Sequence, residues 1–87
     1  MKKELRERIY KEGIVVARYC DDAKPITDFD YCDEALYLYE GEFYLFEYAT
    51  AQYCRMEKIS AEKAVQWVNE TFYGARADEL TAEVQKA

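Results

Sequence analysis

Residues 34–49 read EALYLYEGEFYLFEYA, in which aliphatic and aromatic side chains alternate on both sides of Gly41. A period of two is typical of β-strands, and a glycine between two such runs indicates a tight turn. In the predicted hairpin, one face receives the pairs Leu38–Phe43 and Leu36–Leu45. A slip of one residue would mix the two faces, so the hydrophobic pattern predicts this register.

The turn of this hairpin has two possible lengths. It consists either of Glu40-Gly41 alone or of four residues from Tyr39 to Glu42. The longer form avoids a positive φ at Glu40, which is unfavourable for a residue other than glycine. The pattern leaves both lengths open.

A helix is predicted over residues 60–73. Ser60 is a good N-cap, and Glu62 lies in the first turn, where the helix dipole favours negative charge. The spacing predicts that one side of this helix is buried, and the residues on that side are Ala61, Val65, Val68 and Phe72. Ala64 and Trp67 widen the buried side. Gly74 is expected to end the helix, and a short second helix follows with Leu80 and Val84 on one side.

The remaining segments are shorter. The β-branched run Ile14–Tyr19 is expected to be a strand, and the polar residues 20–33, which contain the only proline, a loop. Residues 57–59 are expected to pair briefly at a sheet edge. We therefore predict one α+β domain over residues 1–87: an antiparallel meander of three or four strands packed against one main C-terminal helix.

Charge is distributed unevenly along a chain whose net charge is −6. Residues 1–19 carry six bases and three acids, whereas residues 21–47 carry nine carboxylates and one lysine. An acidic segment of this kind repels phosphate, so neither a nucleic acid nor an anionic membrane is an expected partner. A protein with a basic surface fits better.

The hairpin combines these carboxylates with aromatic rings on its second face. Tyrosine is enriched in protein interfaces, which makes this face a candidate surface, although a helix or the N-terminal segment could instead cover it as core. The candidate partner-binding residues are Asp28, Asp30, Asp33, Glu34, Tyr37, Tyr39, Glu40, Glu42, Tyr44, Phe46, Glu47 and Tyr48.

Catalysis, metal binding and cofactors are not expected. The chain has no histidine to activate a nucleophile, and its three cysteines match no common zinc spacing. Glu34 and Glu47 face each other in the predicted register, and such like charges need a nearby base, for which Arg18 is a candidate. The acidic run beginning at Asp28 departs from the EF-hand pattern at Cys32 and Asp33, which leaves a weak divalent-ion site as the alternative to a solvated loop.

The order of several short motifs resembles a group of small uncharacterised proteins of Gram-positive bacteria and their mobile elements. The motifs are Arg8-Ile9-Tyr10, DFDYCDEALY at residues 28–37, GEFYL at 41–45, Glu57-Lys58-Ile59 and EKAVQW at 62–67. Residues 49–56 replace the glycine-rich loop usual in that group. The resemblance implies an α+β fold and supplies no catalytic residues.

Residues 1–13 can be interpreted in two ways. Leu5 and Ile9 at i, i+4 suit a short helix that ends at Gly13, while the alternation of Leu5, Glu7 and Ile9 suits a strand that turns at Gly13. The resemblance favours the hairpin across Gly13.

These observations lead to two functional hypotheses. The first is a non-enzymatic, cytoplasmic protein-binding module, in its concrete form an inhibitor of the anti-CRISPR kind that covers a basic nucleic-acid-binding surface of a host effector. The alternative is a homo-oligomeric structural or regulatory protein whose tyrosine face pairs with itself. No apolar run reaches the ~18 residues that a membrane span needs, and no signal peptide is evident.

Overall fold

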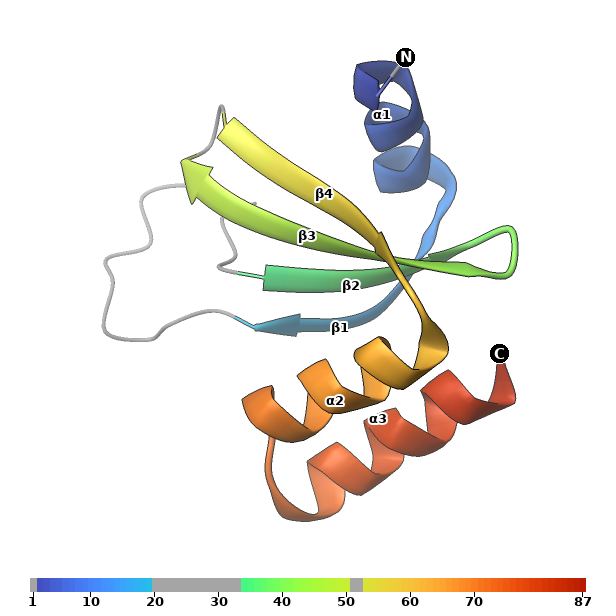
Figure 1. Ribbon diagram of the computed structural model, residues 1–87, viewed down its shortest axis with the longest axis vertical. Coiled ribbons are helices and arrows are strands. Elements are labelled where there is room, and N and C mark those ends of the chain that lie inside the picture. Colours follow the sequence, from blue (N-terminus) through green and yellow to red (C-terminus); the bar gives the residue numbers. More distant parts are fainter. Residues whose placement is uncertain (1, 20–33, 51–52) are drawn as a thin grey trace.

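Four antiparallel strands form one sheet in chain order in this computed structural model, which describes residues 2–19, 34–50 and 53–87 (Figure 1). The strands are β1 (Ile14–Tyr19), β2 (Glu34–Tyr39), β3 (Glu42–Thr50) and β4 (Tyr53–Ile59). The helices are α1 (Lys2–Glu12), α2 (Ala61–Thr71) and α3 (Gly74–Lys86). The predicted α+β class, with an antiparallel meander and C-terminal helices packed on it, is confirmed.

The helices lie on opposite faces of the sheet, α1 on one side and the α2–α3 pair on the other (Figure 1). Each face has its own core. Ile9 of α1 packs with Ala35, Tyr37, Tyr44 and Phe46, while α2 and α3 cover Leu36, Phe43 and Ile59. Both faces of β2 and β3 are therefore buried, which explains why these two strands are apolar on both sides.

The central hairpin has the predicted register, with Leu38 opposite Phe43 and Leu36 opposite Leu45. Its turn is the two-residue form, because Tyr39 pairs directly with Glu42. Glu40 has φ 51° and Gly41 has φ 78°, so the longer turn that would relieve Glu40 does not form. Two consecutive positive φ angles match the twist of the flanking strands, and this outweighs the local cost at Glu40.

The N-terminal segment is a helix, so the favoured hairpin across Gly13 is wrong. In α1, Ile9 is fully buried against the sheet, and Leu5 lies one turn earlier on the same face. The backbone N–H of Gly13 donates to the carbonyl oxygen of Ile9, at 2.7 Å, which ends the helix. A Cβ at Gly13 would lie 2.5 Å from that oxygen, so glycine is required there by close approach rather than by positive φ.

The C-terminal helices differ from expectation in their bounds. The hydroxyl of Ser60 caps α2 by accepting from the backbone N–H of Lys63, as predicted, but the helix already ends at Thr71. Its buried residues are Ala64, Trp67 and Val68, while Ala61 is exposed, so the buried stripe is rotated around the helix from the predicted one. The helix that follows is longer than α2, because Ala77, Leu80 and Val84 give it a buried side of its own.

Replacing Ile9 by alanine should destabilise the protein by about 2–4 kcal/mol, because it leaves a cavity between α1 and the aromatic face of the sheet. Chemical denaturation followed by circular dichroism measures this change. Glu7→Ala, at an exposed position of the same helix, is the matched control and should stay within about 0.5 kcal/mol. Equal effects of the two substitutions would show that α1 does not pack on the sheet.

Glu40→Asn should stabilise the protein by about 0.5–1 kcal/mol, because asparagine tolerates positive φ and Asn-Gly is the preferred sequence of this turn. The free energy of unfolding in urea gives the measurement. Glu40→Gln removes the same charge without that conformational preference. An equal gain from Gln would assign the effect to charge instead of backbone strain.

Candidate functional site

The predicted partner-binding residues do not form one surface. Strand alternation places Glu34 and Glu47 on the face that α2 and α3 cover, and the tyrosines on the face that α1 covers. Asp28, Asp30 and Asp33 lie outside the described residues, as does the side chain of Tyr48. The divalent-ion alternative also depends on these aspartates, and the described residues alone contain no group of three or more acidic or sulfur ligands that could hold a metal ion.

The tyrosine face is core rather than surface over most of its extent. Tyr37 and Phe46 are each 1% exposed, and Tyr44 is 8% exposed. The ring centroids of Tyr37 and Phe46 are 4.8 Å apart. Of the two possibilities that the sequence left open, burial therefore holds for these three residues, and they cannot contact a partner. The reason is α1, whose apolar side covers them.

Tyr39 lies at the border of this core and is only partly buried. Its hydroxyl donates to Oε2 of Glu12, at 3.3 Å, which joins the hairpin to the end of α1. Partial desolvation, followed by the nearby negative charges of Glu40 and Glu12, raises the pKa of Tyr39 above its ordinary value. The hydrogen bond between Tyr39 and Glu12 has a structural role. Glu40 lies at the tip of the turn and is exposed.

Glu34 has a structural role as well. It is half-buried at the start of β2, and its Oε2 accepts a hydrogen bond from Nε1 of Trp67 on α2. The indole ring, in turn, meets Phe72 edge-on with centroids 5.7 Å apart. Glu34 thus fixes Trp67 between the helix and the sheet, and a buried indole N–H finds its acceptor.

The predicted opposition of Glu34 and Glu47 is present, and the nearby base is Arg55 instead of Arg18. Arg55 stands opposite Glu47 in the pairing of β3 with β4. Arg18 pairs with Ala35 and so belongs to the other face of the sheet. The positive charge of Arg55 beside the two adjacent carboxylates reduces the repulsion between them.

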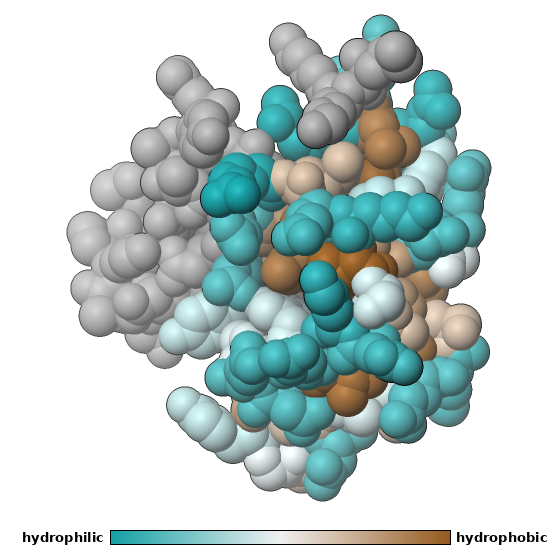
Figure 2. Space-filling view, in the orientation of Figure 1, coloured by the Kyte–Doolittle hydropathy of each residue, from teal (hydrophilic) through white to brown (hydrophobic). Residues whose placement is uncertain are grey.

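A groove runs along this part of the molecule between β4 and α2, and we call it the acidic groove. Its larger part encloses about 200 Å³, and it adjoins a smaller hollow through Leu45 and Glu57. Hydrophilic side chains border hydrophobic ones on this face in Figure 2. The residues that line it are Leu45, Glu47, Arg55, Glu57, Ile59, Lys63, Gln66, Trp67 and Glu70.

The acidic groove has an apolar floor and charged walls. The floor is made by Leu45, Ile59 and Trp67. Three exposed carboxylates and two bases stand around it: Glu47, Glu57, Glu70, Arg55 and Lys63. Glu70 is oriented by Gln66, whose Nε2 donates to Oε1 of Glu70 at 3.1 Å. Such a groove can accept a long cationic side chain, with the aliphatic stem on the floor and the charged head beside the carboxylates.

Only Glu47 of the predicted site residues lines this groove. Glu57, Trp67 and Glu70 were missed because they come from β4 and α2, far from the acidic segment in sequence. A weak signal was present: Arg55, Glu57 and Ile59 alternate onto one strand face, and Trp67 and Glu70 share one side of a helix. The neighbouring Glu42 is already engaged, since Nζ of Lys58 lies 3.4 Å from its Oε2.

This chain matches no known protein family, and neither a curated protein nor a solved structure is significantly similar to it. The resemblance to small proteins of Gram-positive bacteria therefore stays a prediction. None of the described helices is long and apolar enough to cross a membrane.

Glu34→Ala should destabilise the fold by about 1–3 kcal/mol, since it leaves the indole N–H of Trp67 buried without an acceptor. Trp67 is the only tryptophan, so its fluorescence reports both the local change and the unfolding transition. Glu34→Gln keeps an acceptor and should cost less. Glu47→Ala, the exposed carboxylate directly opposite, serves as the control and should stay within about 0.5 kcal/mol.

Proposed function

We propose that this chain is a non-enzymatic module that binds a protein partner through the acidic groove, and that the partner presents lysine or arginine side chains there. The observation that carries this proposal is the arrangement of three carboxylates around an apolar floor, where Glu47, Glu57 and Glu70 outnumber the two bases Arg55 and Lys63. Carboxylates at the rim select cations, and the floor supplies apolar contact that a dispersed acidic surface lacks.

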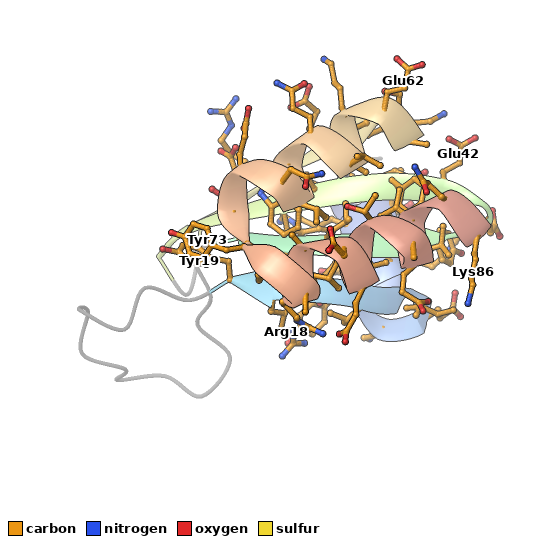
Figure 3. The ribbon with its side chains drawn as sticks, turned by 90° about the horizontal axis from the view of Figure 1, so that it is seen from below. Arg18, Tyr19, Glu42, Glu62, Tyr73 and Lys86 are labelled. Atoms are coloured by element: carbon orange, nitrogen blue, oxygen red, sulfur yellow. The ribbon has the colours of Figure 1, made fainter. Side chains whose placement is uncertain are left out.

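The overall charge supports the same kind of partner. A net charge of −6 on 87 residues attracts a basic surface from a distance and accelerates its encounter. Figure 3 shows Glu42 and Glu62 toward one edge of the molecule and Arg18 toward the opposite edge.

The available side chains favour binding over catalysis. The single serine of the sequence, Ser60, is engaged as the cap of α2, and the chain has no histidine to act as a general base. In its most specific form, the proposal is an inhibitor from a mobile element. Its carboxylates would take the place of phosphates on a basic nucleic-acid-binding surface of a host effector, as anti-CRISPR proteins do.

The self-pairing of a tyrosine face does not fit as the alternative. Tyr37 and Tyr44 are buried within one copy of the chain, so a second copy cannot bury them further. Self-association would need another surface.

Deca-arginine is a direct probe of the acidic groove, and its binding can be followed by the fluorescence of Trp67. The double variant Glu57→Gln, Glu70→Gln should weaken binding about fivefold to tenfold, which corresponds to two partly exposed charge contacts. The matched control is Asp78→Asn, Glu79→Gln on α3, which removes the same charge away from the groove. If both double variants weaken binding equally, deca-arginine responds to the net charge of the protein and not to the acidic groove.

The same two double variants identify a natural partner in a pull-down from a bacterial lysate. A partner that the wild-type chain and the α3 control retain, but that the groove variant loses, supports the proposal. The complex should also dissociate by about 0.5 M salt, where screening shortens the Debye length to ~4 Å. A partner that the groove variant retains fully would contradict it.

A further inference from the structure

The two edge strands of the sheet differ in how they are protected. The exposed residues of β4 include three charged ones, Arg55, Glu57 and Lys58. β1 has the sequence IVVARY and a single charged residue, Arg18. Soluble proteins commonly place charges on edge strands to prevent pairing with other chains. By the criterion of charge, β4 is protected and β1 is not, and the irregularity of β1 is a shift of its register against β2 between Val15 and Ala17.

Exposed hydrophobic residues gather around β1. Among the described residues, the large hydrophobic side chains that are exposed are Tyr10, Ile14, Val15, Tyr19 and Tyr73. Three of these belong to β1, and Ile14 is 65% exposed. Tyr10 lies in the last turn of α1, just before β1. Tyr73 directly follows Phe72, and the ring centroids of Phe72 and Tyr19 are 6.5 Å apart. Clusters of this kind on an otherwise hydrophilic domain mark interaction sites.

A groove of about 390 Å³ lies beside the same edge, between β1 and α3. Ile14, Val16 and Leu38 line its sheet side, and Leu80 lies on its helix side. A strand that pairs with β1 would therefore find a backbone edge with no partner strand among the described residues, and an apolar hollow for one of its side chains. This combination is typical of strand addition to a sheet edge.

The charges on the α3 side of this edge are balanced, unlike those of the acidic groove. Arg76, Glu83 and Lys86 line the groove, and Nη1 of Arg76 lies 3.8 Å from Oε2 of Glu79. A strongly basic partner gains little here, and an acidic partner is repelled by the net charge of −6. Two copies that meet at this edge keep their acidic grooves on the far sides, which limits the repulsion between the two grooves.

We propose that two copies of the chain associate through β1, antiparallel to each other, so that their sheets join into one continuous sheet across a two-fold axis. Arg18 lies near one end of β1. Pairing centred on the middle of the strand places it opposite an apolar residue near the start of the partner strand, which avoids facing like charges. Ile14 of each copy then lies at the junction, next to the groove of α3.

Sedimentation velocity of the full chain from about 10 µM to about 1 mM tests this proposal, since that range covers weak dimers. The expected result is a reversible monomer–dimer equilibrium. Ile14→Lys should raise its dissociation constant about tenfold or more, because it puts a charge at the junction of the paired edges. Ala61→Lys, at an exposed position of α2, adds the same charge away from β1 and should leave the equilibrium unchanged.

Hydrogen exchange of the wild-type chain gives a second measurement that needs no variant. Backbone amides of β1 should become better protected as the concentration rises, while those of β4 should not. A monomer throughout the concentration range, a dimer that both lysine variants weaken equally, or protection that appears on β4 would each overturn the proposal. So would a monomeric chain that binds another protein in a way that depends on Ile14.

This inference is independent of the acidic groove. The pair Glu57→Gln, Glu70→Gln should leave dimerisation unchanged, and Ile14→Lys should leave binding of deca-arginine unchanged. Failure of one proposal is therefore distinguishable from failure of the other.

Discussion

The alternation of side chains along β2 and β3 is the constraint on which the rest of the fold depends. Once Leu36 faces Leu45 and Tyr37 faces Tyr44, one face of the hairpin is aliphatic and the other is aromatic. Neither face can be left in water at an acceptable free energy, because each buried aromatic or aliphatic side chain contributes about 1.5–3 kcal/mol. Both faces therefore need a cover, which α1 provides on one side and α2 with α3 on the other.

Local patterns in the sequence were enough to predict the elements that local forces determine. The register of the central hairpin follows from its period of two, and the start of α2 follows from the capping hydroxyl of Ser60. The favoured conformation of residues 2–12 was wrong, because Leu5 and Ile9 suit a helix and a strand equally well. What decides between them is the aromatic face of a hairpin that lies far along the chain. The same holds for Glu40, whose positive φ is imposed by the twist of the strands on either side.

The candidate site was less predictable than the fold, for a related reason. An alternating tyrosine face has the same sequence whether it is a docking surface or a core, and only the placement of α1 separates the two cases. The acidic groove arises where an edge strand and a helix happen to meet, and its carboxylates are separated in sequence by neutral and basic residues. Composition predicts an excess of negative charge, but the position of the groove depends on the packing of α2 against β3 and β4.

The two edges of the sheet suggest how one small domain can combine two interactions. β4 carries several charges and borders the acidic groove, whereas β1 is apolar apart from Arg18. A dimer joined at β1 would carry one acidic groove at each outer end, and a partner with two basic patches could engage both. Linked binding of this kind raises the overall affinity by orders of magnitude without any new contact, provided that the spacing matches. The modest energy of a few exposed charge contacts would then be enough for a stable complex, and the affinity would depend on protein concentration as well as on salt.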